Sequence, residues 1–314
     1  MSALTLGCMG MSGMYGPSDE RESISTIHAA IDAGINLLDT GDFYGMGHNE
    51  MLIGRAIEGR RNQVLLSVKF GGMRMPNGAF IGLDGRPNAV KNFLAYSLQR
   101  LRTDHIDIYR LTRPDPAVPI EETVGAIAEL IQAGYVRYVG LSESGAATIR
   151  RAHATHPVCD LQIEYSLASR AIEREILPTV RELGIAVTAY GVLSRGLLTG
   201  SQPVGKSDFR AHLPRFSGAN GEHNRQVVAD LAAMAAARGV TPAQLAIAWV
   251  MTKGDDIVPV IGARTRRQLA ESLGALEVKL SAADIARLEE ICNPERIAGA
   301  RYGADQMQML DSER

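Results

Sequence analysis

The sequence is poor in several features that would each assign it to a particular class of protein. It has only three cysteines in 314 residues, Cys8, Cys159 and Cys292, and they lie far apart. That number is too small for a disulfide framework, and the spacing does not match a zinc site. We therefore predict no metal site, and we interpret Cys8, which lies in an apolar run, as a small core residue.

The sequence also lacks a large excess of charge of one sign and long hydrophobic runs. The net charge is −2, whereas proteins that bind nucleic acids or anionic membranes need a basic excess, so we expect neither partner. No apolar run approaches the length of a membrane-spanning helix, and we expect no signal peptide because the first residues lack a basic stretch. We expect a cytoplasmic protein, and the sequence leaves open whether it forms a homo-oligomer.

What the sequence does contain is an alternation of short apolar runs with longer amphipathic stretches. Hydrophobic residues make up 46% of the chain and charged residues 22%, which is typical of a globular protein with a large core. The runs that predict strands are Leu4–Cys8, Ile35–Asp39, Val64–Lys69, Ile106–Thr112, Tyr138–Ser142, Leu161–Tyr165, Ala186–Tyr190 and Ile257–Ile261. The stretches that predict helices between them are Glu20–Ala33, Asn49–Glu58, Ala89–Leu101, Ile120–Ala133, Ala146–His156, Ile172–Leu183, Arg225–Arg238, Pro242–Met251 and Thr265–Leu276.

Strands that alternate with helices predict a parallel sheet with right-handed crossovers. Eight such units favour a closed (β/α)8 TIM barrel over an open sheet, and 314 residues suit one α/β domain that spans 1–314. Two segments fall outside the alternation, the long loop Gly191–Glu222 after the seventh strand and an extra C-terminal helix at Ser281–Ile291. Chemistry in such barrels takes place at the carboxyl ends of the strands, so the side chains there are our candidates.

Three of those side chains suggest acid–base chemistry. Asp39 ends the second predicted strand, Tyr44 lies in the loop that follows, and Lys69 ends the third. A tyrosine hydroxyl is a weak acid at neutral pH, and we expect a neighbouring cation, held in place by a carboxylate, to lower its pKa. The set would then donate a proton to a carbonyl oxygen. From these residues alone, a buried ion pair beside a packing tyrosine is an equally good interpretation.

The motifs around these residues resemble those of the aldo-keto reductases. The central one is Asp39-Thr40-x-x-x-Tyr44-Gly45, followed by Lys69 at the next strand end. The other motifs span nearly the whole chain in the order of that family: Leu6-Gly7-Cys8-Met9-Gly10-Met11-Ser12, Arg113-Pro114-Asp115-Pro116, Gly140-Leu141-Ser142, Gln162-x-Glu164-Tyr165-Ser166, Arg195-Gly196-Leu197-Leu198-Thr199-Gly200 and Gly262-Ala263-Arg264. Together they are very specific, although most would be weak alone.

The resemblance implies a catalytic set and also shows two departures from the family pattern. It implies that Tyr44 is the acid/base and that Asp39 and Lys69 tune it. Relatives usually have histidine as a fourth catalytic residue at the end of strand four, where this chain has Thr112. Relatives also commonly begin with a β-hairpin that plugs the barrel floor, which this chain lacks. We therefore expect the floor at Met1–Leu4 to be covered by the C-terminal segment or by a second subunit.

The cofactor that the resemblance implies is NADP(H), bound at the barrel mouth. Ser142 and Gln162 would hydrogen-bond the nicotinamide carboxamide, and Tyr190 would stack on the ring. The start of the last predicted helix between strands and tail, Thr265–Leu276, has several arginines around it and suits the 2′-phosphate of the adenosine ribose. The complete set expected to bind the cofactor is Gly10, Met11, Asp39, Ser142, Gln162, Tyr190, Leu193, Arg195, Leu197, Gly262, Arg264, Gln268 and Glu271.

Two functions are compatible with this sequence. The first is an NADPH-dependent oxidoreductase that reduces an aldehyde or ketone to an alcohol, or runs the reverse reaction, with a small-molecule carbonyl or alcohol as substrate. The second is an NADP(H)-binding regulatory or sensor module with vestigial turnover, which resembles the potassium-channel β subunits. Thr112 suggests the second function, whereas the intact set Asp39, Tyr44 and Lys69 favours the first, because a pure binder needs no tuned tyrosine.

Overall fold

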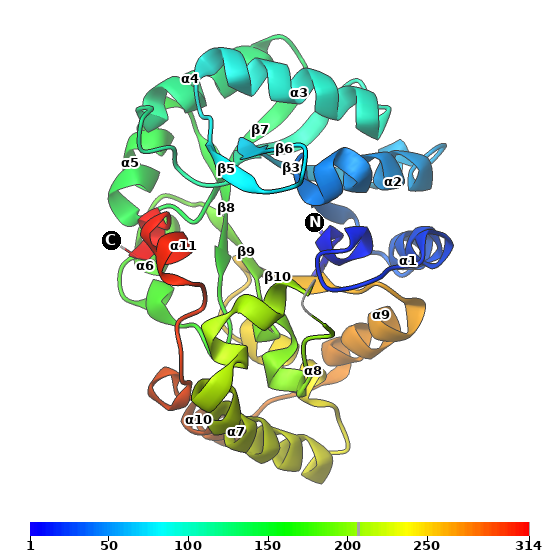
Figure 1. Ribbon diagram of the computed structural model, residues 1–314, viewed down its shortest axis with the longest axis vertical. Helices are drawn as coiled ribbons and strands as arrows, with labels where there is room; N and C mark the ends of the chain where they lie inside the picture. Colours follow the sequence, from blue (N-terminus) through cyan, green and yellow to red (C-terminus); the bar gives the residue numbers. More distant parts are fainter. Residues whose placement is uncertain (206–207, 314) are drawn as a thin grey trace.

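The computed structural model describes residues 1–205 and 208–313, and its centre is a closed barrel of eight parallel strands. Neighbouring strands around the barrel follow the order β1-β10-β9-β8-β7-β6-β3-β2 (Figure 1). Their bounds are β1 Thr5–Gly7, β2 Leu37–Gly41, β3 Leu65–Phe70, β6 Ile106–Leu111, β7 Val136–Ser142, β8 Val158–Glu164, β9 Ala186–Tyr190 and β10 Ile257–Gly262. The single-domain (β/α)8 barrel predicted from the alternation is confirmed.

Helices surround the barrel and connect successive strands (Figure 1). They are α1 Glu20–Asp32, α2 His48–Ala56, α3 Pro87–Leu101, α4 Ile120–Gln132, α5 Ala146–Thr155, α6 Ile176–Glu182, α7 Gly218–Ala237, α8 Pro242–Met251 and α9 Arg266–Leu273. Two further helices, α10 Ala282–Ile291 and α11 Ala304–Gln308, follow the barrel, so the extra C-terminal helix is confirmed. Among the described residues no single helix is long and apolar enough to cross a membrane, and α7 with α8 reaches that length only across a bend of 87°.

Local sequence explains where several helices begin and end. Gly34 and Gly134 follow α1 and α4 with φ of 89° and 83°, a left-handed conformation that glycine adopts without strain. Thr241 caps α8 in a capping box with Gln244, and Pro242 fills the first helical position, where no backbone N–H is needed. The strand residues between these stops are almost all buried, as expected for a parallel sheet covered on both faces.

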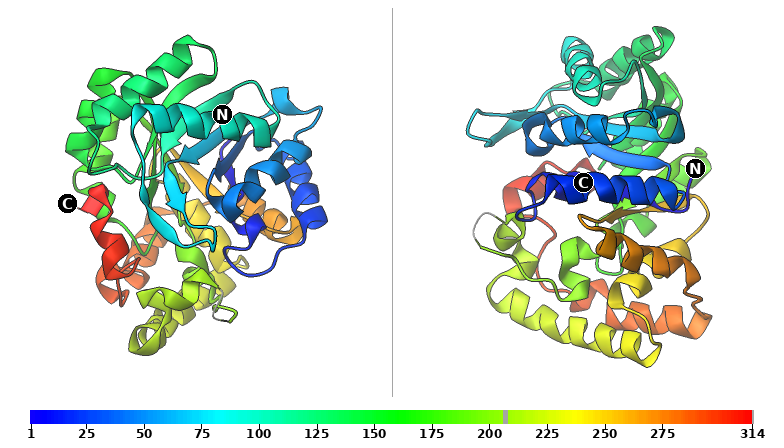
Figure 2. Two further views of the ribbon diagram at one scale, coloured as in Figure 1. Left: turned by 45° about the horizontal axis from the view of Figure 1, so that its top comes forward. Right: turned by 90° about the vertical axis from the view of Figure 1, so that its right-hand side faces the viewer.

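Two parts of the chain are more ordered than the sequence indicated. The antiparallel hairpin of β4 (Gly72–Arg74) and β5 (Phe80–Leu83) lies between β3 and α3 and was not predicted. The loop after β9, expected at Gly191–Glu222, contains short 3-10 helices such as Ser194–Thr199, and α7 already begins at Gly218. In the right-hand view of Figure 2, the hairpin and the C-terminal segment lie toward the left, the end opposite the N-terminus.

The floor of the barrel differs from our expectation. Residues 1–4 form no hairpin, and Leu4 is only 1% exposed, so other residues of this chain cover Leu4. The C-terminal segment does not lie there, because Arg301 contacts Glu143, just past the carboxyl end of β7. The expectation that this segment covers the floor was therefore wrong, whereas a second subunit against Met1, which is 60% exposed, stays a prediction. The segment instead helps to build the mouth.

Candidate active site

Asp39, Lys69 and Tyr44 meet at the carboxyl ends of β2 and β3. Lys69 Nζ donates to Asp39 Oδ1 over 2.6 Å, and both side chains are buried. Tyr44 begins a 3-10 helix (Tyr44–Gly47) directly after β2, and its ring lies 5.0 Å from Lys69 Nζ. The structure thus brings together the three residues that the sequence assigned to proton transfer.

The electrostatics of Tyr44 differ from the sequence argument. We expected the Lys69 charge to lower the pKa of Tyr44, but burial and the nearby Asp39 carboxylate raise that pKa well above its ordinary value. The reason is that Asp39 neutralises Lys69 at close range, while the desolvated hydroxyl has no water to stabilise its anion. Burial also lowers the pKa of Lys69, which Asp39 opposes. Tyr44 is therefore held protonated, the form that can donate a proton.

The second oxygen of Asp39 reaches a third strand. Gln162 Nε2 donates to Asp39 Oδ2 over 2.7 Å, and Ser67 Oγ donates to the same oxygen over 3.2 Å. Ser67 in turn accepts from Arg110, which is fully buried and ion-paired with Asp160 at 2.9 Å. These polar groups cross the barrel interior below the site and hold Asp39 in one orientation.

Thr112 follows β6 at the barrel mouth and is 8% exposed. Its hydroxyl donates to the carbonyl oxygen of Phe70 over 2.7 Å. A hydroxyl has one hydrogen to donate, so in this arrangement Thr112 offers only an acceptor to a substrate. Whether it takes part in catalysis stays a prediction.

The residues predicted to hold the nicotinamide lie side by side on neighbouring strands. Ser142 ends β7 and faces Gln162 of β8 in register. The Gln162 amide nitrogen donates to Asp39, which leaves the carbonyl oxygen as the end of this side chain that could accept from a ligand. Tyr190 ends β9, and its hydroxyl donates to Glu143 Oε1 over 2.8 Å, which fixes the ring.

The loop that contributes three residues to the predicted cofactor set follows Tyr190. It contains Leu193, Arg195 and Leu197, and Arg195 Nη2 donates to the buried Glu164 over 2.9 Å. Ser194 and Arg195 have φ of 47° and 58°, and Met46 and Glu143, also after carboxyl strand ends, have φ of 55° and 49°. Non-glycine residues with positive φ are costly and collect at functional sites. Four of the five such residues described here lie at the mouth.

The predicted adenosine end lies after β10, where Gly262 ends the strand and Thr265 caps α9. The Arg264 backbone N–H donates to Gln268 Oε1 over 2.9 Å, and its guanidinium donates to the carbonyl oxygen of Tyr15. Three arginines lie here, Arg264, Arg266 and Arg267, and Arg266 is the one whose charge is already paired, with Glu22. The side chain of Glu271 lies exposed on α9.

Gly10 and Met11 lie in a 3-10 helix (Met9–Ser12) that faces this end. A Cβ on Gly10 would lie 3.3 Å from Arg264 Cγ, so glycine permits the close approach of the two segments. Met11 is buried. The residues of the predicted cofactor set therefore lie at the carboxyl ends of barrel strands or in the segments that follow them.

Sequence reasoning missed a buried charge network that the C-terminal segment completes. Arg301 donates to both carboxylate oxygens of Glu143 and contacts Glu164, which also binds Arg195. Burial raises the pKa of Glu143, but Arg301 outweighs it and brings that pKa below its ordinary value. The next residue, Tyr302, places its hydroxyl 2.9 Å from that of Tyr190. Acidic residues after two buried strands were the available signal, but nothing indicated that their partner was so distant in sequence.

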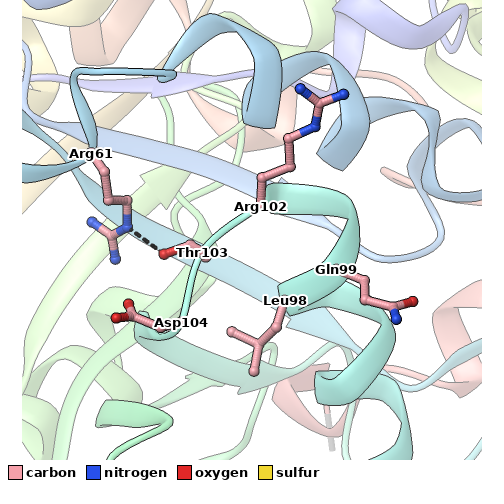
Figure 3. A pocket seen from close by; sticks show the side chains of 6 residues that line it. All are labelled: Arg61, Leu98, Gln99, Arg102, Thr103 and Asp104. Atoms are coloured by element: carbon pink, nitrogen blue, oxygen red, sulfur yellow. Dashed lines mark hydrogen bonds between the residues drawn. The ribbon is translucent and has the colours of Figure 1, made fainter.

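Other features of the described residues offer no competing site. No group of three or more histidine, cysteine, aspartate or glutamate side chains in that part of the chain could hold a metal. A hollow of about 580 Å³ lies at the amino end of β6, opposite the catalytic residues, and is lined by Arg61, Leu98, Gln99, Arg102, Thr103 and Asp104 (Figure 3). Arg61 there is used internally, since it donates to Thr103 Oγ1 and pairs with Asp107.

Comparisons with known proteins agree with this geometry. The model of the aldo/keto reductase family matches residues 3–293. An aldo-keto reductase of Schizosaccharomyces pombe, whose name includes NADP(+), is 40% identical over 96% of this chain and 91% of its own. The glycerol dehydrogenase of Gluconobacter oxydans is similar in structure, with a TM-score of 0.84, 30% identity and coverage of 93% of this chain and 91% of its own. An aldo-keto reductase of Klebsiella pneumoniae, solved with NADPH, has a TM-score of 0.73 at 27% identity over 94% of this chain and 92% of its own. The chain belongs to the aldo/keto reductase family.

Proposed function

We propose that this protein reduces an aldehyde or ketone to an alcohol with NADPH, and that Tyr44 donates the proton. The coarser part of this function, an oxidoreductase that uses NADP(H), rests on family membership and on the cofactor in the name of the yeast relative. The observation that carries the finer part is the arrangement of Asp39, Lys69 and Tyr44, in which a protonated tyrosine lies beside a lysine fixed by a carboxylate.

The residues at the mouth suit NADP(H). Arg267, exposed in the first turn of α9, has no carboxylate within 4.0 Å among the described residues, and Arg264 beside it has none either. Such a pair of cations is the donor set that a ribose 2′-phosphate requires. The oxygen of Gln162 and the hydroxyl of Ser142 would hold the carboxamide, Tyr190 the ring, and the loop with Leu193, Arg195 and Leu197 the pyrophosphate.

The chemistry divides between the cofactor and the chain. When bound, the reduced nicotinamide supplies hydride to the carbonyl carbon of the substrate. Tyr44 breaks its O–H bond and transfers the proton to the carbonyl oxygen, which becomes the alcohol. The tyrosinate left on Tyr44 lies beside the Lys69 ammonium, which stabilises it, and Asp39 keeps that ammonium in place. Solvent then returns the proton to Tyr44. Alcohol oxidation uses the same groups in reverse.

The test is turnover in both directions. Purified protein is mixed with NADPH and a panel of aldehydes and ketones, and with NADP⁺ and the matching alcohols, while the absorbance of the reduced nicotinamide is followed. We expect carbonyl-dependent loss of NADPH that Tyr44→Phe removes. A protein that binds NADPH and turns over none of the panel would favour a regulatory module instead.

No observation in the described part of the chain favours that regulatory module, which Thr112 alone suggested. The catalytic roles of Asp39, Tyr44, Lys69 and Thr112, the cytoplasmic location and the oligomeric state stay proposals.

A further inference from the structure

Arg113 is an arginine at the wall of the site that the proposed mechanism does not use. It follows Thr112 at the end of β6 and is half-buried. Its Nη1 donates to the carbonyl oxygen of Thr112 over 2.7 Å and to Ser142 Oγ over 3.3 Å, and its Nη2 lies 3.5 Å from the hydroxyl of Tyr302. These three contacts fix the guanidinium between the strand end of β7 and the C-terminal segment.

This guanidinium lacks the counter-charge that the neighbouring buried cations have. Lys69, Arg110, Arg195, Arg215 and Arg301 each lie within 4.0 Å of a carboxylate. No carboxylate of the described residues lies that close to Arg113. Its nearby acidic residue, Glu143, is already bound on both oxygens by Arg301 and also accepts from Tyr190 and Ser312. A half-buried cation without a counter-charge favours an anionic ligand.

The unused edge of Arg113 has the geometry for such a ligand. Nη1 donates to two protein groups and Nη2 to one. Nε has no hydrogen-bond partner in the described part of the chain. Nε is also absent from the buried polar atoms that lack a partner, so it is open to solvent. Nε and Nη2 carry parallel N–H bonds that together bind the two oxygens of one carboxylate.

Arg113 lies close to the end of β3 that carries Lys69, because the residue before it, Thr112, binds the carbonyl oxygen of Phe70. Its charge acts on Tyr44 and on Lys69 and lowers the pKa of each, although burial dominates both groups. Thr112 beside it is shorter than the histidine usual in relatives, and its hydroxyl is turned to the Phe70 carbonyl oxygen. This part of the wall therefore offers a short side chain and a free guanidinium edge rather than an imidazole.

We propose that Arg113 determines specificity by binding a carboxylate carried by the carbonyl substrate, so that oxo acids are preferred over neutral aldehydes and ketones. This inference rests on the proposed function, because it names the substrate class of the same site. The carbonyl group would lie at Tyr44 and the carboxylate at the Nε–Nη2 edge of Arg113. Arg113 is then a specificity residue that leaves the chemical step to Tyr44.

The test compares acids with their own methyl esters, which keep the shape and remove the charge. The substrates are glyoxylate, 4-oxobutanoate and 5-oxopentanoate, since the three lengths sample the distance between Tyr44 and Arg113. For the acid of matching length we expect kcat/KM at least about tenfold above that of its ester. In Arg113→Met the KM of this acid should rise about 10- to 100-fold, the range for one charge-assisted contact. The KM of the ester should change less than about threefold, and any change in kcat should be the same for the acid and the ester.

Two further variants show whether the preference for the acid depends on the guanidinium of Arg113 itself. Arg113→Lys keeps the charge but loses the paired N–H edge, so it should retain part of the preference for the acid. Arg150→Met removes an arginine on the outer surface that is paired with Glu182, and it should leave the preference unchanged. Because Arg113 contacts Ser142, NADPH affinity is measured for each variant, and it should stay near that of the wild type.

Binding gives a readout that does not need turnover. Calorimetric titration of 4-oxobutanoate and 5-oxopentanoate into the NADP⁺-loaded protein should show binding that Arg113→Met weakens at least tenfold. Equal kinetics for all acids and esters, or an equal loss of both in Arg113→Met, would overturn the inference. If binding depends on Arg113 but no carbonyl compound is reduced, the inference stands and the proposed function fails.

Discussion

The side-chain amide of Gln162 donates a 2.7 Å hydrogen bond to Asp39 Oδ2, while Lys69 binds Asp39 Oδ1. One carboxylate therefore orients both the lysine beside the proton donor and the amide predicted to hold the nicotinamide. The other end of this amide is its carbonyl oxygen, an acceptor, which suits the NH₂ of a carboxamide. In the proposed mechanism the reacting ring and the proton donor would thus be positioned from the same residue of β2.

We predict that Tyr44→Phe lowers kcat for carbonyl reduction by about 100- to 10,000-fold, the usual contribution of a positioned proton donor. The affinity for NADPH should stay nearly unchanged, because only the transition state uses the proton. Stopped-flow kinetics and a fluorescence titration of NADPH check the two statements. A variant with the kcat of the wild type would remove Tyr44 from the mechanism.

The pH dependence should differ between the two directions. Burial and Asp39 raise the pKa of Tyr44, so the hydroxyl stays protonated across the neutral range and beyond its ordinary pKa. Reduction needs the protonated form, so the rate of reduction should not fall through deprotonation of Tyr44 up to about pH 9. Oxidation needs the tyrosinate, whose fraction rises about tenfold per pH unit below the pKa, so log kcat/KM should climb with a slope near one. An oxidation rate that is level between pH 6 and 9 would contradict the raised pKa.

The sequence predicted the barrel well because its signals are local and repeated. Every barrel strand from Leu4 to Ile261 was found within a few residues, since each is a short buried run between helices with clear stops such as Gly34. The β4–β5 hairpin was missed because its strands are very short and half-exposed, although Asn77-Gly78 was a turn signal between them.

The nicotinamide end was harder to predict, because it depends on contacts between distant segments. Arg301 and Tyr302 come after the last barrel helix and reach Glu143 and Tyr190, more than a hundred residues earlier. The direction of the Tyr44 pKa shift was also wrong, because the sequence shows neither burial nor which charge is nearest. Burial and the nearest charge both depend on where the folded structure places each side chain.

The arginines after β10 give a prediction with an internal control. Arg267→Met should raise the Kd of NADPH about 10- to 100-fold and leave that of NADH unchanged, because only NADPH carries the 2′-phosphate. Arg266→Met removes a neighbouring charge that Glu22 already pairs, so it should have a much smaller effect. Fluorescence titrations at low and high salt measure these Kd values. Added salt should reduce the difference between the Kd of NADPH and that of NADH. Equal Kd values for the two cofactors in the wild type would refute the phosphate site.

The C-terminal clasp, which we define as the contacts of Arg301 with Glu143 and Glu164, should be essential for stability. Arg301→Met leaves two buried carboxylates short of a partner and should lower the free energy of unfolding by about 3–5 kcal/mol. Adding Glu143→Gln removes one of those charges, so the double variant should be more stable than the sum of the single effects indicates. Urea unfolding of the wild type, the two single variants and the double variant gives the four free energies of unfolding. Strict additivity would show that the two side chains do not interact energetically.

The last prediction concerns Thr112→His. An imidazole at this position would extend past the present hydroxyl and supply a donor for the carbonyl oxygen, and such a donor typically contributes on the order of 100- to 1,000-fold in kcat. We expect faster turnover of small neutral aldehydes and slower turnover of bulkier substrates, because the ring fills the space beside Arg113. The matched control is Thr112→Val, which removes the hydrogen bond to Phe70 without adding a donor. It should cost about 1 kcal/mol of stability and give no gain in turnover. If neither variant changes the kinetics of any aldehyde, Thr112 does not line the substrate pocket.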